Sequence, residues 1–417
     1  MKRYPKYKET GVPWLGQVPA HWEVKRLKRV FSETREKAIQ GDEQLAATQK
    51  YGVVSQAQFM KDQDQKLVLA MKGTENFKHV ERDDFVISLR AFEGGIERSS
   101  QSGCVSPAYT VLRSKGAASP AFAARLLKTP EFISQISMTY DGIREGKAIK
   151  FKDAGPVSLP IPPLSEQAGI AIFLDGVLDQ MDSAIAAQER MIELLKERRS
   201  SIITQAVTKG LDPNAKMKDS GVPWLGQVPA HWEVKRLRFL VSNKAHKSEF
   251  IKGDYVGLEN IESATGAYSP AEDFIPSGVV SHFTYGDILF GKLRPYLQKV
   301  ALAIRAGFCS TEILPLTPAK MENGPYLQRL LSCWGFIDYI NSASYGSKMP
   351  RVDWSMLADV PMPYPPVREA ISIHEHLSVK LEAMNNAIKT QEHMIELLKE
   401  RRSAIITQAV TGQIDVR

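Results

Sequence analysis

The chain contains the same blocks twice, and this internal repeat constrains its fold more than any other feature. Residues 11–27, GVPWLGQVPAHWEVKRL, return without a change at 221–237. A second block, MIELLKERRS at 191–200, returns at 394–403. Two long repeats are too few for a solenoid, which stacks several short units. The order predicts a tandem duplication, in which a shared block, a stretch that differs and a shared helical block are followed by the same three again.

Identical blocks around different inserts predict pseudo-twofold symmetry. If the shared blocks do one job twice and the inserts do two jobs, the target should have two related halves. Duplex DNA is the commonest target of that kind. The alternative is a duplication that has no symmetric role.

The second shared block belongs to a long helix in each copy. From Ser165 to about Gly210 the sequence has no proline, and apolar residues follow a 4,3 spacing over more than four heptads. The second copy runs from about Arg368 to Thr411. We expect the two helices to pack on each other antiparallel and to dock partner proteins; the alternative is that each is an ordinary core helix of its own domain. The expected packing positions are Ile170, Leu174, Val177, Met181, Ala184, Met191, Leu195 and Ile202, then Ile373, Leu377, Leu381, Met384, Met394, Leu398 and Ile405.

A basic run lies on each of these helices. It reads Lys196-Glu197-Arg198-Arg199 in the first copy and Lys399-Glu400-Arg401-Arg402 in the second. Alternating charges on a helix are typical of a solvated or partner-facing surface. We therefore expect these runs to face solvent or a partner protein, and not DNA.

The stretches between the shared blocks, 28–164 and 238–365, lack long helical periodicity. Short β-branched and aromatic runs at 51–54, 84–90, 255–258 and 287–290 predict strands. A helix is expected at 121–137, kinked near Pro130, and another at 325–340. The fold class is therefore α+β: two mixed α/β domains joined by two long antiparallel coiled-coil helices. The predicted boundaries are 1–164 and 211–367 for the mixed domains, and 165–210 and 368–417 for the helices.

Basic and polar residues gather with aromatics near the ends of the predicted strands. Arg and Lys suit guanine edges, while hydroxyl groups and amides suit phosphates and other base edges. We therefore predict DNA contacts in both inserts. The candidates are Arg90, Glu93, Arg98, Ser99, Ser100, Tyr140, Arg144, Lys147 and Lys150 in the first insert, and Lys292, Arg294, Tyr296, Gln298, Tyr345, Ser347, Lys348 and Arg351 in the second.

The composition bounds the class of protein. Charged residues make up 24% and hydrophobic residues 43%, near the average of soluble globular proteins. No apolar run reaches the ~18–20 residues needed to span a bilayer, and no apolar segment follows the first residues. Three scattered cysteines favour neither a disulfide framework nor a metal site. We expect a cytoplasmic protein. The net charge of +7 fits a polyanionic partner, although it is weak evidence alone.

The sequence offers no convincing catalytic or metal site. Residues 286–293 come close to a phosphate-binding loop, but Leu293 stands where the motif needs a hydroxyl group for Mg²⁺. His374 and His376 would lie on different faces of a helix, which disfavours joint metal binding. We expect no catalytic residue, metal or cofactor in this chain.

Taken together, the motifs resemble one known family, the specificity (S) subunits of type I restriction–modification systems. The repeated block at the head of each half resembles that family's entry motif. DFVISLRAFEGG at 84–95 and GDILFGKLRPY at 286–296 resemble two types of target recognition domain. LPIPPLSEQ at 159–167 resembles the junction into the conserved helix. The second junction has Arg368-Glu369-Ala370 where Glu-Gln is usual, which puts the start of the second helix in question.

The resemblance implies a non-catalytic DNA-recognition subunit. Each recognition domain would read one half of an asymmetric, split site in double-stranded DNA. The conserved helices would dock two modification (methyltransferase) subunits, and restriction (motor-nuclease) subunits could join. S-adenosylmethionine, ATP and Mg²⁺ would be bound by those partners, with no membrane involved. Two alternatives stay open: a coiled-coil scaffold for two domains that bind ligands other than DNA, and an NTPase built on residues 286–293.

Overall fold

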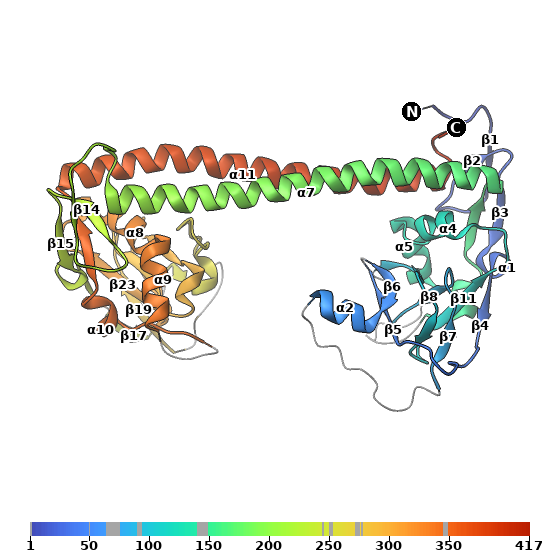
Figure 1. The fold of residues 1–417 in the computed structure, drawn as a ribbon, viewed down its shortest axis with the longest axis horizontal. Helices are drawn as coiled ribbons and strands as arrows, with labels where there is room; N and C mark the ends of the chain where they lie inside the picture. The colour runs from blue at the N-terminus through green and yellow to red at the C-terminus, as the bar shows by residue number, and fades with distance from the viewer. Residues whose placement is uncertain are drawn as a thin grey trace. The chain divides into compact units, whose positions relative to one another are not determined.

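The chain folds into two compact units, each with a globular α/β part and a segment of two long helices (Figure 1). Unit 1 comprises residues 1–188 and 393–417, and unit 2 comprises residues 189–392. The computed structural model describes residues 2–49, 51–63, 76–89, 94–139, 149–243, 246–249, 253–271, 276, 278–344 and 349–417. The units divide the chain differently from the predicted domains, because each unit takes part of both long helices.

Both long helices are present as the sequence predicts. Helix α7 spans Leu164–Lys209 and helix α11 spans Val367–Val410. In unit 1, Ile170 near the start of α7 shares a core with Ala409 near the end of α11. In unit 2, Val207 near the end of α7 shares a core with Ile373 near the start of α11. The helices therefore run antiparallel within each unit, which confirms the predicted fold class.

The packing face of the helices differs from the predicted one at a single place in each copy. Met191 and Met394 are exposed, at 48% and 45%, whereas the neighbouring Ile192 and Ile395 are buried. The predicted packing is wrong for these two methionines, while their docking of a partner protein stays a prediction. An eleven-residue step from Met181 leads to Ile192, and eleven residues make three turns of a nearly straight helix, so strict heptad spacing drifts off the buried face.

The other predicted packing positions lie at or near the buried face. Those that are buried are Ile170, Leu174, Met181, Ile373, Leu377, Leu381 and Ile405. Those that are partly buried are Val177, Ala184, Leu195, Ile202, Met384 and Leu398.

The two globular parts are built on the same four-stranded antiparallel sheet. In unit 1 the order is β4-β11-β8-β9, formed by Phe31–Thr34, Thr110–Ser114, Phe85–Ile87 and Glu97–Arg98. In unit 2 the order is β16-β23-β20-β21, formed by Val241–Asn243, Ile313–Pro318, Ile288–Gly291 and Val300–Leu302. The inserts have therefore kept one topology while their sequences diverged. Strand β20 forms the middle of residues 286–293, the sequence that comes close to a phosphate-binding loop. Residues 288–291 are therefore a buried strand and not a loop.

A pair of short helices packs beside each sheet. These are α4 (Pro120–Leu126) and α5 (Pro130–Met138) in unit 1, and α8 (Gly324–Ser332) and α9 (Trp334–Ser342) in unit 2. The predicted kink near Pro130 is a full break, where the Thr129 hydroxyl caps α5 by accepting from the backbone N–H of Phe132. The single helix predicted at 325–340 is likewise two helices, separated at Cys333.

The shared blocks fasten the inserts to the long helices in the same way twice. Trp22 and Trp232 are fully buried. The Nε2 atom of His21 lies 2.8 Å from a carboxylate oxygen of Glu166 at the start of α7, and His231 makes the same 2.8 Å contact with Glu369 at the start of α11. Helix α11 therefore keeps this contact although its junction departs from the usual sequence.

The strands of the shared blocks also pair in matching ways. The pairs are β1 (Tyr7–Glu9) with β2 (Gln17–Pro19), β3 (Glu23–Arg26) with β12 (Ser158–Ile161), β13 (Met217–Asp219) with β14 (Gln227–Pro229), and β15 (Glu233–Arg236) with β24 (Pro361–Tyr364). Unit 1 also contains α1 (Leu27–Val30), β5 (Leu45–Thr48), β6 (Gly52–Ser55), α2 (Gln56–Gln63), β7 (Lys78–Val80), β10 (Gly103–Val105) and α6 (Phe151–Ala154).

Unit 2 has a second sheet, ordered β17-β19-β22-β18, formed by Lys247–Glu249, Val279–Phe283, Gly307–Cys309 and Tyr255–Val256. Its remaining elements are η2 (Leu237–Phe239), η3 (Leu258–Asn260), η4 (Pro295–Leu297), η5 (Met321–Asn323) and α10 (Trp354–Ala358). Among the residues that the structure describes, no helix is both long and apolar enough to cross a membrane.

Candidate nucleic-acid interface

In unit 2, three of the predicted DNA-contacting residues lie on one tight turn after β20. Arg294 and Gln298 flank the short helix η4, and both have left-handed backbone conformations, with φ of 48° and 52°. Such conformations are uncommon for residues other than glycine and are frequent where a functional site holds the backbone in place. The side chain of Tyr296, between them, is 42% exposed, and Arg294 is exposed as well. The turn therefore presents an arginine and an aromatic ring to solvent.

The fold brings two further predicted residues to this turn. The backbone N–H of Arg294 donates to the carbonyl oxygen of Pro350 at 2.8 Å, next to Arg351. The backbone N–H of Val352 donates to the carbonyl oxygen of Lys292 at 3.1 Å. Burial lowers the pKa of the Lys292 amine. Residues far apart in sequence thus form one cationic surface.

Arg351 is already engaged within that surface. Its Nη2 atom lies 3.0 Å from Oε1 of Glu312, so part of its charge is neutralised. Arg294 forms no ion pair with any described residue. Arg294 is consequently the stronger candidate of the two for a contact with a base or a phosphate.

In unit 1, the described candidates have mixed placements. Arg98 donates from Nε to Asp83 Oδ1 at 2.8 Å, and its side chain is 36% exposed. Ser99 is fully buried and donates its hydroxyl to the carbonyl oxygen of Gln101, so the structure contradicts the predicted DNA contact for Ser99. Ser100 is exposed and donates to the carbonyl oxygen of Val53 at 3.1 Å. Lys150, at the start of α6, is exposed.

The remaining predicted contacts fall outside the described residues. They are Arg90, Glu93, Tyr140, Arg144, Lys147, Tyr345, Ser347 and Lys348. For these residues the DNA contact stays a prediction.

An open cavity of about 690 Å³ lies in unit 1 beside strand β9. Its lining includes Gln44, Tyr51, Gln56, Tyr109 and Glu97. The Glu97 side chain is 3% exposed, and Nζ of Lys128 lies 2.6 Å from its carboxylate. Burial raises the pKa of Glu97 to about 7, and the ammonium group of Lys128 offsets only part of that rise. The cavity combines aromatic rings, amides and one carboxylate close to Ser100 and Arg98, the residues predicted to meet DNA.

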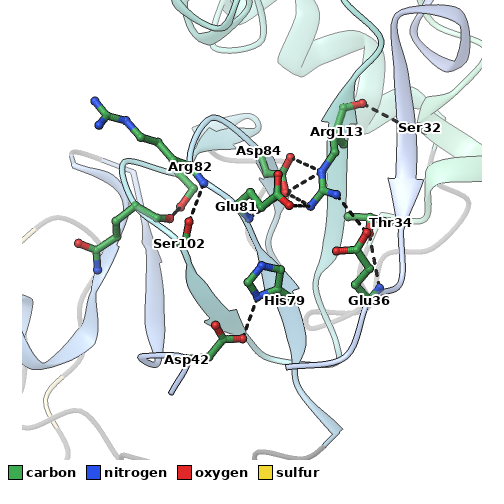
Figure 2. Close-up of polar contacts among 12 residues, drawn as sticks. Ser32, Thr34, Glu36, Asp42, His79, Glu81, Arg82, Asp84, Ser102 and Arg113 are labelled. Atoms are coloured by element: carbon green, nitrogen blue, oxygen red, sulfur yellow. Dashed lines mark hydrogen bonds and ion pairs between the residues drawn. The ribbon is translucent and has the colours of Figure 1, made fainter. Parts of the chain in front are cut away.

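A network centred on Arg113 holds several strands of unit 1 together (Figure 2). Its guanidinium group lies 2.9 Å from Asp84, 3.0 Å from Glu36 and 3.5 Å from Glu81. The Nδ1 atom of His79 lies 2.8 Å from a carboxylate oxygen of Asp42. The guanidinium group of Arg113 offsets the negative charge of Asp84, Glu36 and Glu81.

The same network includes the one group of possible metal ligands within the described residues. Glu36, His79 and Glu81 each offer a ligand atom, and these atoms lie within 4.8 Å of one another. The sequence analysis did not find this group, because Glu36 lies far along the chain from His79 and Glu81. Arg113 already pairs with both glutamates, so we assign the group a structural role.

Comparison with known proteins shows which proteins this chain resembles. No family model matches the chain. The specificity subunit of the type I restriction enzyme EcoDI from Escherichia coli is 24% identical over 287 residues, which cover 64% of this chain and 64% of that protein. The putative MjaX specificity subunit from Methanocaldococcus jannaschii is 20% identical across 97% of this chain and 96% of its own. The curated relatives of this chain are thus type I restriction enzyme specificity subunits.

Solved structures agree on the fold. A chain from a study of complex assembly and conformational transition of the type I R-M system matches with a TM-score of 0.72 at 15% identity, covering 95% of this chain and 99% of that one. The HsdS subunit from Thermoanaerobacter tengcongensis matches with a TM-score of 0.54 at 16% identity, covering 95% and 98%. The resemblance inferred from the motifs is therefore confirmed. The chain spans less than two thirds of the length of EcoDI and MjaVIII, which it matches over 64% and 63% of their residues.

Proposed function

We propose that this chain is the DNA sequence-recognition subunit of a type I restriction–modification complex and works in the cytoplasm. Each globular part reads one half of an asymmetric bipartite site. The long helices dock two modification subunits, which methylate DNA, and restriction subunits can join the assembly. S-adenosylmethionine, ATP and Mg²⁺ are bound by those partners, and this chain contributes no catalytic residue.

One observation carries the proposal. The two halves have identical shared blocks, which form a common frame, and the same sheet order. The stretches between these blocks differ in sequence. A repeated frame around two different surfaces suits a target whose two parts are related in position and different in content, as in a split DNA site. The names of the curated relatives, all specificity subunits of type I restriction enzymes, support the same reading.

The exposed turn of unit 2 supports base reading in particular. Arginine pairs with guanine through two parallel hydrogen bonds, and an aromatic ring packs against bases or sugars. Arg294 and Tyr296 have the exposure that such contacts require. The left-handed backbone at Arg294 fixes the direction in which its side chain leaves the turn.

A genome-wide map of adenine methylation tests the proposal. Cells that carry this chain with its modification subunit are compared with cells that lack only this chain. We expect a split motif that disappears with the chain. Identical maps would contradict the proposal and favour the alternative, a coiled-coil scaffold whose two domains bind ligands other than DNA.

The same assay tests the role of Arg294. If its guanidinium group reads a base, Arg294→Ala costs about 1–3 kcal/mol of binding free energy and relaxes the motif at one position only. Arg236→Ala is the matched control, because Arg236 is exposed on the shared frame and pairs with Asp359. Uniform weakening across all sequences would make Arg294 a phosphate contact instead.

A further inference from the structure

Two arginines of unit 1 are neutralised by aspartates on helix α7. Nη2 of Arg125, in α4, lies 2.7 Å from Oδ1 of Asp175. Nε of Arg402, in α11, lies 3.0 Å from Oδ1 of Asp182. The two aspartates are one heptad apart, so they lie on one side of α7. Each arginine thus has its own carboxylate partner.

Unit 2 has the same two arginines and lacks both aspartates. Arg199 occupies the place of Arg402 in the repeated block MIELLKERRS. Arg329 occupies the place of Arg125, since an Arg-Leu-Leu sequence stands at 125–127 and again at 329–331. The positions that correspond to Asp175 and Asp182, counted back from the repeated block, are Ser378 and Asn385. The repeat therefore keeps the cations and loses the anions.

The contacts in unit 2 show the result of this exchange. Nη1 of Arg199 donates to Oδ1 of Asn385 at 2.9 Å, and Nη1 of Arg329 donates to the carbonyl oxygen of Thr265 at 3.3 Å. Neither arginine forms an ion pair with any residue described in the structure. The Nε atom of Arg329 is buried and has no hydrogen-bond partner among the described residues.

The two guanidinium groups also repel each other. Burial lowers the pKa of Arg329, and the charge of Arg199 lowers it further. Burial lowers the pKa of Arg199 as well, while Glu262 acts in the opposite direction. Glu262 accepts a hydrogen bond from the Thr265 hydroxyl at 2.8 Å, so its charge is shared with that group. Unit 2 therefore holds an excess of partly buried positive charge that unit 1 does not have.

A cavity of about 250 Å³ opens beside Arg199. Its lining includes Lys196, Arg199, Ser200, Gln298, Ser332 and Trp334. The Ser332 hydroxyl donates to the carbonyl oxygen of Arg329 at 3.0 Å, and Gln298 ends the exposed turn that carries Arg294. The nearest acid to Lys196 is Glu193, at 3.7 Å. Two cations, the Gln298 amide and the Ser200 hydroxyl thus converge on one space without a carboxylate in its lining.

We propose that this cavity binds a phosphate group of the DNA backbone. A phosphate oxyanion suits it because guanidinium groups form paired, charge-assisted hydrogen bonds with oxyanions, and amides and hydroxyls add further donors. The inference rests on the proposed function, since DNA supplies the phosphate. It assigns to Arg199 and Lys196, which both line the cavity, a role that the sequence did not suggest, because the run at 196–199 was expected to face solvent or a partner protein.

The repeat itself supplies the test. The double variant S378D/N385D gives unit 2 the carboxylates that unit 1 has, and should neutralise both arginines. The matched control S378A/N385A removes the same side-chain contacts without adding charge. DNA binding by the complete complex is measured as a function of salt concentration, together with the methylation motif.

We expect the slope of log K against log salt to become less negative by about 0.9 in S378D/N385D, because one phosphate contact is lost. The weakening should be equal for all DNA sequences, the motif should be unchanged, and S378A/N385A should keep the wild-type slope. Arg199→Gln provides a second route to the same loss if the double variant folds poorly.

An unchanged slope in S378D/N385D and in Arg199→Gln, with wild-type motif reading intact, overturns the inference and leaves the proposed function standing. If the wild-type complex reads no motif, the proposed function fails first. A third outcome also overturns the inference. If S378D/N385D weakens assembly with the modification subunits in the absence of DNA, while the slope of log K against log salt stays constant, the cavity binds a carboxylate of a partner protein instead. Protection of the wild type against heat by inorganic phosphate, absent in the double variant, distinguishes a site for free phosphate from one that only DNA can fill.

Discussion

One buried hydroxyl group of unit 2 is absent from the matching place in unit 1 and gives the sharpest test of the fold. Tyr326, in α8, is almost fully buried, and its hydroxyl donates to the carbonyl oxygen of Val207 at 2.8 Å. Val207 lies in the last turn of α7, where carbonyl groups have no partner within the helix. The corresponding residue of unit 1 is Phe122, which is buried and has no hydroxyl group.

We predict that Tyr326→Phe weakens unit 2 alone. The substitution keeps the ring and removes the donor, so the Val207 carbonyl is left buried without its partner. An unsatisfied buried acceptor costs about 1–3 kcal/mol, and the ring leaves too little space for water to replace the hydroxyl. A loss of about 1–2 kcal/mol corresponds to an increase of roughly 5- to 30-fold in the population of the open state.

Hydrogen exchange followed by mass spectrometry measures this change in each unit separately. Peptides from α8 and from the end of α7 should exchange faster, whereas peptides from α4 and α5 in unit 1 serve as the internal control. Tyr364→Phe is the matched variant, because the hydroxyl of Tyr364 accepts from Asn323 Nδ2 at 3.2 Å in a half-buried site where water can substitute. Equal acceleration in both units, or none in unit 2, would refute the reasoning.

Further predictions concern the other features described above. Ile192→Ala should lower the free energy of unfolding by about 2–4 kcal/mol, because Ile192 is buried. Met191→Ala should lower it by less than about 0.5 kcal/mol, because Met191 is exposed, and thermal unfolding of both variants checks the corrected packing face. Burial raises the pKa of Glu97 to about 7 in the folded state, from its ordinary value of 4.5, so unit 1 should lose about 3 kcal/mol of stability as the pH rises through that range. Glu97→Gln should remove this loss, and melting temperatures at pH 5 and pH 8 that fall equally in both proteins would contradict it.

Much of this architecture could be predicted from the sequence. The duplication fixed the number of long helices, and the absence of proline between Ser165 and Gly210 set the bounds of α7 to within one residue. The packing face was harder, because a strict heptad count drifts on a nearly straight helix and reached Met191 instead of Ile192. The breaks before Pro130 and at Cys333 depend on local capping, which periodicity does not show.

The candidate site was only partly predictable. The exposed turn could be found from its arginine, tyrosine and glutamine, but its left-handed residues 294 and 298 could not, since neither is glycine. Ser99 looked available because small polar residues commonly line DNA, yet its strand neighbours bury it. The exchange of Asp175 and Asp182 for Ser378 and Asn385 is visible in the sequence. Its meaning appears only when the structure puts Arg125 and Arg402 beside those aspartates.

The division of the chain into units has a consequence for its synthesis. Unit 2 is one continuous stretch of sequence, residues 189–392, so all of its core is available once that stretch has left the ribosome. Unit 1 lacks Ile405, Ala409, Val410 and Ile414 until much later, although these side chains fill the core around Trp22 and Leu174.

At about 5–20 residues per second, the part of unit 1 that is made first waits roughly ten seconds or longer for its last helical segment. During that time the apolar face of residues 170–181 lacks the side chains of α11 that complete its core. The second half of the protein can therefore finish folding before the first, and chaperones that bind apolar helix faces should be found on chains that have passed residue 188 and have not yet reached residue 405.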